Sequence, residues 1–273
     1  ELFAEGTRDC ASVKVWRDSR SGVIFIKDYY IGHKSYRAGG AETPEYNAIK
    51  RSSFEDANDC TRRVNDFRAM YYDKTVCELG FGSGEFMRAV SPFCETISGV
   101  ELSAEQLLRL SEKGFPVEED LCQFGEQTFD SVFLFHTFEH FPDPLIKLEQ
   151  IRKSLKNDGK VIIEVPHARD FLLRDDMACD AFKSHTLWSQ HLILHTRHSL
   201  GVMLGACGFK DILVRGVQRY PLSNHFQWLA RGEPGGHMSN ISSIDTAFLT
   251  DAYQTSLAKI DSTDTIIAVA TAM

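Results

Sequence analysis

The chain has 273 residues, of which 43% are hydrophobic and 25% are charged, as in ordinary globular proteins. The net charge of −8 disfavours nucleic acid as the main partner, because phosphate binding needs concentrated lysine and arginine. No apolar run reaches the roughly 20 residues that cross a bilayer. Seven scattered cysteines without a C-x-x-C pair indicate reduced thiols. We therefore expect a cytoplasmic protein without a membrane partner.

Residues 1–70 are predicted to form an N-terminal cap outside the nucleotide-binding part of the chain. Residues 13–18 and 22–26 are two short apolar runs around a turn, which predicts a β-hairpin. Residues 46–70 are predicted to be helical and carry Arg62 and Arg63. In one interpretation this cap closes over the cofactor end of a pocket. In the other it is a packing arm or a dimer contact.

From residue 75 onward, predicted strands and helices alternate, which indicates a mostly parallel sheet covered on both faces. Gly159 is expected to end the helix before the fifth strand, and Pro142 and Pro144 to bracket the start of that helix. The predicted strands are residues 75–79, 96–100, 115–118, 131–135 and 160–165, and the predicted helices are residues 85–90, 104–113, 144–155, 185–206 and 248–259.

Two further strands are predicted near the C-terminus, over residues 211–219 and 265–270. No regular crossover helix needs to separate them, so they can pair antiparallel. The insertion between them, residues 221–264, is expected at the carboxyl edge of the sheet, where a long segment is suited to act as a substrate lid. Residues 71–273 would then form one domain that includes this insertion.

The most informative segment is the glycine turn, Gly80-Phe81-Gly82-Ser83-Gly84, which lies between a strand carrying Glu78 and a predicted helix. Its glycines allow a sharp bend and a close approach to a ligand, since glycine lacks Cβ. A dinucleotide fingerprint needs G-x-G-x-x-G, but its third glycine is replaced by Glu85, which would face a pyrophosphate. Glu101 lies about 20 residues after the turn, which is the spacing at which a carboxylate contacts a ribose in a βαβ unit. The pattern favours S-adenosylmethionine, which carries no phosphate.

These motifs, in this order, resemble those of the class I S-adenosylmethionine-dependent methyltransferases. The resemblance covers about residues 70–220 and the closing strand, and Phe81 stands where that family often has a small residue or cysteine. It implies an α/β fold with a doubly wound, seven-stranded, mostly parallel sheet whose last strand is antiparallel, and S-adenosylmethionine as cofactor. The matching segments are residues 77–84, 99–103, 119–121, 129–132, 138–144 and 155–161.

Acidic residues around the glycine turn are candidates for contacts with the cofactor. Glu78 would anchor its amino group, or else accept backbone N–H groups in the turn. Glu101 would accept both ribose hydroxyls, or else act as a charge at a helix N-terminus. Asp120 would receive the adenine amino group, or else lie in a solvated loop. The predicted cofactor-binding residues are Glu78, Gly80, Phe81, Gly82, Gly84, Glu101, Leu102, Asp120, Leu121 and His136.

Histidines at the expected carboxyl edge of the sheet are candidates for proton transfer. His136 is predicted to line the cofactor pocket. With Glu139 and His140 it forms the spacing H-x-x-E-H, which is that of an inverted zinc-protease motif. That motif lies on a helix, whereas this segment follows a predicted strand, so no metal is predicted. Some ubiquinone-pathway members of the family place a divalent cation near the equivalent pair. At least one of His167 and His191 is predicted to act as the general base. In the alternative interpretation, each is a polar residue of the pocket whose hydrogen bonds the protein itself provides.

The sequence predicts a methyltransferase that acts on a polar small molecule. An activated methyl group needs alignment with the acceptor more than strong acid or base chemistry. Aromatic and polar residues at 224–228 and 234–237 favour a sugar or sugar nucleotide, methylated on oxygen or nitrogen. The resemblance extends to enzymes of bacterial surface-polysaccharide and secondary-metabolite pathways. The alternatives are a cofactor-binding regulatory protein without turnover, an RNA methyltransferase and a nicotinamide-dependent oxidoreductase, and a homodimer stays open.

Overall fold

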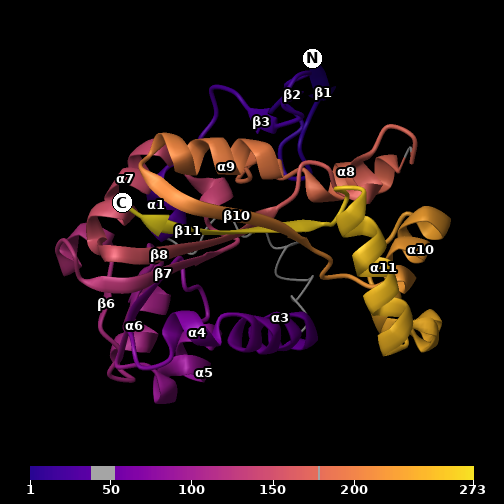
Figure 1. The fold of residues 1–273 in the computed structure, drawn as a ribbon. Helices are drawn as coiled ribbons and strands as arrows, with labels where there is room; N and C mark the ends of the chain where they lie inside the picture. Colours follow the sequence, from indigo (N-terminus) through magenta and orange to yellow (C-terminus); the bar gives the residue numbers. More distant parts are fainter. Residues whose placement is uncertain (38–52, 178) are drawn as a thin grey trace. The chain divides into compact units, whose positions relative to one another are not determined.

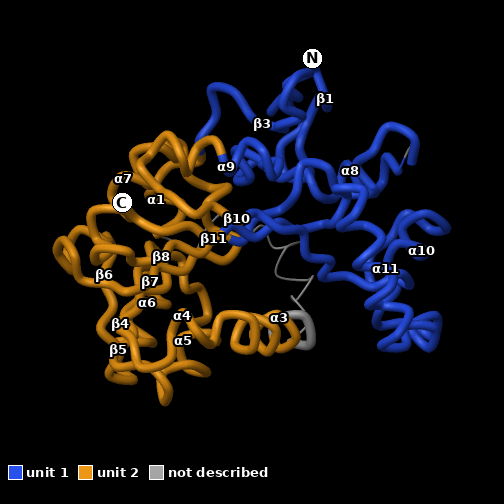
Figure 2. Tube along the Cα trace, in the orientation of Figure 1, with its two compact units in different colours: residues 1–30, 164–201, 214–268 blue, residues 31–163, 202–213, 269–273 orange. Residues whose placement is uncertain are grey.

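A computed structural model describes residues 1–37, 53–177 and 179–273. The chain divides into two compact units, each built from separated segments and coloured separately in Figure 2. The domain boundary predicted at residue 70 and the lid predicted over residues 221–264 stay predictions. Unit 1 comprises residues 1–30, 164–201 and 214–268, and unit 2 comprises residues 31–163, 202–213 and 269–273.

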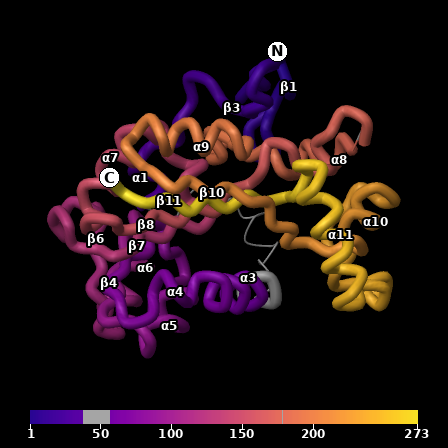
Figure 3. The backbone as a smooth tube through the Cα atoms, in the orientation of Figure 1, coloured from indigo at the N-terminus to yellow at the C-terminus, as the bar shows by residue number. Residues whose placement is uncertain are grey.

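A seven-stranded sheet contains all the strands that were predicted from residue 75 onward, in the order β10-β11-β8-β7-β4-β5-β6. β4 pairs in parallel with β5 and β7, β5 pairs in parallel with β6, and one strand is antiparallel, which confirms the predicted α/β sheet. β11, the last strand in the chain, lies between β8 and β10 (Figure 3). The strands are β4 (Thr75–Leu79), β5 (Thr96–Val100), β6 (Val117–Glu118), β7 (Phe129–Phe135), β8 (Leu155–Pro166), β10 (Phe209–Val217) and β11 (Thr265–Ala272).

Helices cover both faces of the strands in unit 2, as in a doubly wound fold. α4, α5 and α6 lie on one side of β7 and β8, and α7 lies on the other (Figure 1). Pro144 occupies the first turn of α7, as predicted. The helices of unit 2 are α1 (His33–Arg37), α3 (Ser53–Asp66), α4 (Arg68–Tyr71), α5 (Glu85–Val90), α6 (Ala104–Ser111) and α7 (Pro144–Ser154), and α9 (Arg197–Ala206) is divided equally between the two units. The part of the predicted helix before residue 53 lies outside the described residues.

A cluster of aromatic rings packs α5 against the central strand β7. The Phe86 ring lies 5.1 Å from that of Phe133 and 4.9 Å from that of Phe135, between ring centroids. Phe67, just before α4, stacks on Phe135 at 5.9 Å. Offset and edge-on ring pairs of this kind add to the free energy gained by burying apolar area. The cluster fixes the helices over the ends of β4 and β7.

The prediction that Gly159 ends a helix is wrong. α7 ends at Ser154, and Leu155 already has extended backbone angles, φ −77° and ψ 140°. Gly159 lies inside β8, where an added Cβ would meet the Lys156 carbonyl oxygen at 2.9 Å and the Phe129 carbonyl oxygen at 3.1 Å. The glycine therefore allows a close approach of two backbones rather than a helix end.

Unit 1 holds a second sheet, of strand order β1-β2-β3-β9. The predicted hairpin is confirmed, since β2 and β3 pair antiparallel with Trp16 opposite Phe25. Its core includes the buried side chains of Phe3, Ile24 and Leu194. The strands are β1 (Leu2–Ala4), β2 (Val15–Arg17), β3 (Ile24–Ile26) and β9 (Ile193–Leu194).

The single helix predicted over residues 185–206 is wrong. The chain forms α8 (Asp180–Thr186), turns extended at Leu187 with ψ 109°, adds β9 to the edge of β3 and only then enters α9. Pairing with β3 is a tertiary interaction that outweighs local helix propensity. The insertion before β11 is helical, with α10 (Leu222–Arg231) and α11 (Ala247–Lys259). Among the described residues, no helix has the length and apolar character that would cross a membrane.

Candidate cofactor site

The glycine turn leaves the end of β4 with three left-handed residues: Gly80 at φ 78°, Gly82 at φ 50° and Gly84 at φ 70°. An added Cβ at Gly80 would lie 2.3 Å from Thr137 Oγ1, and one at Gly84 would lie 2.5 Å from Leu110 Cδ2. These two glycines therefore permit the packing of the protein itself. At Gly82 an added Cβ would meet nothing within 4 Å, so this stretch of backbone faces open space. A ligand can approach the main chain there.

The ring of Phe81 forms part of the packing under the turn. Phe81 is 4% exposed, and an added Cβ on Gly99 would lie 2.5 Å from its Cδ1 atom and 2.7 Å from Met87 Sδ. Gly99, on the neighbouring strand β5, thus makes room for a large residue where the family often has a small one. Phe81 supports the turn from the protein side.

The Glu101 carboxylate is held at the end of β5 by three main-chain donors. Its Oε2 accepts from the Gly82 N–H at 2.9 Å, and its Oε1 accepts from Leu102 at 2.7 Å and Ser103 at 3.1 Å. A carboxylate has about four acceptor positions. One position therefore remains on Oε2, beside the open face of the turn. Bonds to two ribose hydroxyls would require one main-chain bond to be exchanged.

The Glu78 carboxyl is buried next to the turn, with 5% of the residue exposed. Burial raises its pKa to about 8, although the charge of Arg63 and a hydrogen bond from the Met87 main chain act against this rise. Its Oε2 atom accepts no hydrogen bond from any described residue. A buried oxygen without a donor is costly. A cationic ligand group such as an ammonium would complete it, so the residues present fit the predicted cofactor.

Asp120 caps a short 3-10 helix, η2 (Leu121–Phe124). Its side chain accepts from the Cys122 N–H at 2.8 Å, and Gln123 accepts from the Asp120 N–H at 2.9 Å. The loop after β6 is thereby ordered, with the Leu121 side chain buried. Asp120 itself is exposed, so its carboxylate is held in place and reachable from solvent.

His136 follows β7 with φ 51°, a left-handed conformation that few residues other than glycine adopt. Its Nδ1 lies 3.5 Å from Glu139 Oε1, and Glu139 is fully buried. Glu139 and His140 belong to a single 3-10 turn, η3 (Phe138–His140). These residues therefore do not form the α-helix that an inverted zinc-protease motif needs. Strain of this kind gathers at functional sites.

Residues 54–214 match the family described as "Methyltransferase domain", which is more than half of the chain. The chain belongs to this family. The resemblance to class I S-adenosylmethionine-dependent methyltransferases is thereby confirmed, and with it the predicted class of cofactor. All the predicted cofactor-binding residues of this methyltransferase chain lie in unit 2.

Two known proteins are similar in sequence to part of this chain. Phosphoethanolamine N-methyltransferase 2 from Caenorhabditis elegans is 27% identical over 165 residues, which are 55% of this chain and 37% of that protein. The ubiquinone biosynthesis O-methyltransferase of Thiobacillus denitrificans is 29% identical over 130 residues, which are 43% of this chain and 56% of that protein. The chain thus spans less than two thirds of the length of either relative.

A similar solved structure is that of a SAM-dependent methyltransferase from Archaeoglobus fulgidus. Its TM-score is 0.54 at 16% identity, and the alignment covers 83% of this chain and 98% of that one. At this identity the likeness shows the fold. The seven-stranded sheet of this methyltransferase chain is therefore that of its family.

The two predicted general bases of this methyltransferase lie in unit 1. His167 is 1% exposed, its Nδ1 lies 3.0 Å from the Thr263 carbonyl oxygen, and its Nε2 lies 3.7 Å from Asp261 Oδ1. Burial lowers the pKa of His167 to about 4, so its ring is neutral at pH 7. His191 is half-buried, with its ring 5.4 Å from that of Trp188. Of the two, His191 is the more accessible.

The polar residues of the insertion, which suggested a sugar acceptor, are largely used inside unit 1. His225 is 2% exposed, and its Nδ1 lies 2.6 Å from the Tyr253 hydroxyl. Trp228 is 4% exposed and packs edge-on against Phe182, with ring centroids 5.3 Å apart. Asn224 accepts from the main chain of Gly235 at 3.1 Å. These side chains hold the insertion together.

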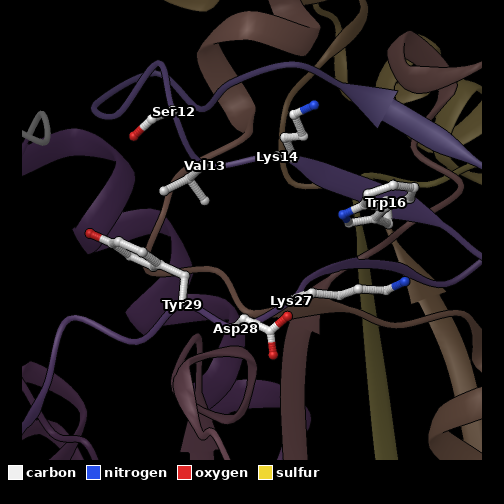
Figure 4. Close-up of a pocket in the computed structure, with 7 residues that line it drawn as sticks. All are labelled: Ser12, Val13, Lys14, Trp16, Lys27, Asp28 and Tyr29. Carbon is white, nitrogen blue, oxygen red and sulfur yellow. The ribbon is translucent and has the colours of Figure 1, made fainter.

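A pocket of about 340 Å³ opens on the N-terminal strands of unit 1 (Figure 4). The Lys27 ammonium lies 4.5 Å from the Trp16 ring centroid, and Lys14 forms an ion pair with Glu5 at 3.5 Å. No ligand is predicted for this region from the sequence. The lining residues are Ser12, Val13, Lys14, Trp16, Lys27, Asp28 and Tyr29.

Proposed function

We propose that the protein binds S-adenosylmethionine in unit 2 and transfers the methyl group to an oxygen or nitrogen of a polar small molecule. One observation carries the proposal: Glu78 is a buried carboxyl with an oxygen that no described residue hydrogen-bonds, next to a glycine turn with an open backbone face. A cationic amino acid joined to a nucleoside without phosphate suits both features.

In this proposal Glu78 holds the cofactor's amino group and Glu101 holds the ribose. Asp120 and the main chain of Leu121 receive the adenine amino group, and His136 lines the pocket. When bound, S-adenosylmethionine supplies a methyl group that its sulfonium already activates for displacement. The protein then has to orient the acceptor, exclude water and take up a proton. We assign proton uptake to His191, because His167 is closed off by its own packing.

The acceptor class is proposed from chemistry and from the relatives' names. One relative is named for methylation of phosphoethanolamine and the other for an O-methylation in ubiquinone biosynthesis. Both names describe small molecules with a polar atom. A sugar or sugar nucleotide stays the narrower prediction, although Asn224, His225 and Trp228 are buried within the insertion. A cytoplasmic location and a homodimer also stay predictions.

Calorimetry with S-adenosylhomocysteine tests the binding step. Transfer of a labelled methyl group from S-adenosylmethionine to each acceptor in a panel tests turnover. The acceptor panel contains amino-alcohol phosphates, phenols, sugar nucleotides and RNA. Binding followed by transfer to one small-molecule class is the expected result. Binding without turnover on any acceptor would indicate a regulatory protein, and transfer to RNA alone would overturn the acceptor class. Tight binding of NADH with no heat from S-adenosylhomocysteine would reject the proposal altogether.

A further inference from the structure

The hairpin of β2 and β3 has a second face that the core of unit 1 does not use. Val15 and Ile24 belong to the buried core cluster. Trp16 lies opposite Phe25 in the pairing of the two strands, and successive side chains of a strand point to opposite faces. Trp16 and Phe25 therefore lie on the face away from that core, and the pocket of about 340 Å³ lies beside Trp16 (Figure 4).

The pocket forms where the chain enters and leaves the hairpin. β3 ends at Ile26, and two residues later Asp28 has φ 55°, a left-handed backbone that aspartate adopts more readily than most residues. Residues 27–29 line the pocket after this bend, and residues 12–14, just before β2, line it on the other side. Val13 is buried and supplies an apolar surface.

Two polar groups border this pocket and are not used inside the protein. Figure 4 shows the indole nitrogen of Trp16 and the carboxylate of Asp28 at the edge of the opening. In the part of the chain that the structure describes, the indole N–H donates to no acceptor, and the Asp28 carboxylate has neither a hydrogen-bond donor nor an ion-pair partner. A donor and an acceptor are thus available to one ligand.

The charges around the pocket occur in opposite pairs. The Lys14 ammonium lies 3.5 Å from a carboxylate oxygen of Glu5. Lys27 precedes Asp28 directly, and its ammonium lies 4.5 Å from the Trp16 ring centroid. An anionic ligand would be repelled by Asp28 and a cationic one by Lys27. This balance favours a ligand without net charge.

We propose that this pocket is a binding site for a neutral saccharide. A sugar hydroxyl both donates and accepts hydrogen bonds, so one ring can accept from the Trp16 indole and donate to the Asp28 carboxylate. Its C–H groups suit the apolar surface of Val13 and the nearby aromatic rings. The volume lies at the lower end of the range for small-molecule sites, roughly 300–1,000 Å³. Because the pocket shares no residue with the cofactor site, this binding is independent of the proposed function.

The test follows the indole N–H signals of the three tryptophans in ¹H–¹⁵N spectra during titration with a sugar. The sugars are glucose, galactose, mannose and N-acetylglucosamine, added without S-adenosylhomocysteine. At least one of them should shift the Trp16 signal saturably. Trp16→Phe keeps an aromatic ring but lacks the N–H group, so the loss of one signal identifies Trp16. Inorganic phosphate and ethanolamine are the charged probes and should not shift this signal.

Asp28→Gly tests the carboxylate, since glycine adopts the left-handed backbone at no steric cost. It should weaken binding of the sugar about 10- to 100-fold, the scale of losing charge-assisted hydrogen bonds. Asp73→Gly is the matched control, because Asp73 is also an exposed aspartate with a left-handed φ of 51°, and it should keep the wild-type affinity. Asp28→Asn removes only the charge and should weaken binding about 3- to 10-fold, which provides a second variant if Asp28→Gly does not fold.

Three results would overturn the saccharide site. The first is a Trp16 signal that none of the four sugars shifts, and the second is equal sugar affinity in Asp28→Gly and Asp73→Gly. The third is saturable binding of phosphate or ethanolamine at Trp16 without a response to any sugar, which would indicate a charged ligand. None of these measurements involves the cofactor, so failure here leaves the proposed methyl transfer to its own test.

Discussion

Each unit holds an acidic residue next to the end of a strand, half-buried Asp264 in unit 1 and buried Glu78 in unit 2, but their carboxyl groups are hydrogen-bonded in different ways. In unit 1, Asp264 accepts from the Gln218 side chain at 2.8 Å and from the main chains of Arg219 at 2.9 Å and Tyr220 at 3.0 Å. In unit 2, Glu78 keeps an oxygen without a donor from the described residues. Burial raises the pKa of both carboxyls. A carboxyl group that the protein hydrogen-bonds fully supports structure, whereas a buried one that lacks a donor indicates a ligand site.

The largest expected effect tests whether unit 1 contributes chemistry as well as structure. We expect His191→Ala to lower kcat about 100- to 10,000-fold, with little change in cofactor affinity, if the acceptor loses a proton during transfer. Steady-state kinetics at saturating cofactor measure this. His198→Ala, at an exposed position on α9, is the control and should keep wild-type kcat. A wild-type kcat in His191→Ala would remove the general-base role.

The second largest effect concerns Asp264, whose carboxylate is hydrogen-bonded by the protein itself. Asp264→Ala removes the acceptor from three partly buried donors, so we expect the free energy of unfolding to fall by about 2 kcal/mol or more. Urea unfolding measures this loss. Asp251→Ala, at an exposed position on α11, should change stability by less than about 0.5 kcal/mol. Equal losses in the two variants would contradict the view that Asp264 completes the end of the sheet.

A third effect concerns Glu101 in unit 2, the predicted ribose contact. Glu101→Ala should weaken S-adenosylhomocysteine binding by about 1–3 kcal/mol, the scale of losing charge-assisted hydrogen bonds. Glu105→Ala, at an exposed position in the next helix, serves as the control. Calorimetry gives both dissociation constants, and circular dichroism checks the fold. An unchanged dissociation constant in a folded Glu101→Ala protein would reject the ribose role.

The smallest effect is the release of a proton from Glu78 when the ligand binds. Its pKa of about 8 in the ligand-free protein means that most molecules carry the protonated carboxyl at pH 7. An ammonium bound there favours the ionised form, so binding should release close to one proton at pH 7 and fewer as the pH rises above about 8. Calorimetry in buffers of different ionisation enthalpy measures this release.

Glu78→Gln is the matched variant for that measurement, because the amide has the shape of the carboxyl but does not titrate in this range. It should bind with no proton release at pH 7. If Glu78→Gln releases as many protons as the wild-type protein, another group titrates and Glu78 does not meet the ammonium. Asp170, whose pKa burial also raises to about 8, lies in unit 1 and is the first alternative to examine.

Local signals in the sequence were sufficient for the strands and turns that bear on the cofactor. β4, β5 and α5 have the predicted bounds, because continuous apolar runs specify buried strands and the glycines specify the turn between them. Glu78 and Glu101 follow from that same local pattern. The mostly parallel sheet follows from the alternation of strands and helices.

Tertiary structure decided what depends on residues far apart in the chain. The break in the helix predicted over residues 185–206 exists because β9 pairs with β3, and Gly159 permits a close approach to Phe129 rather than a helix end. The stacking of Arg63 on Phe135 joins segments that no local pattern connects. Long-range contacts leave no periodic signal in one sequence. Glycine conformation and apolar runs are local properties, whereas the donors that complete a buried acid come from wherever the fold brings them.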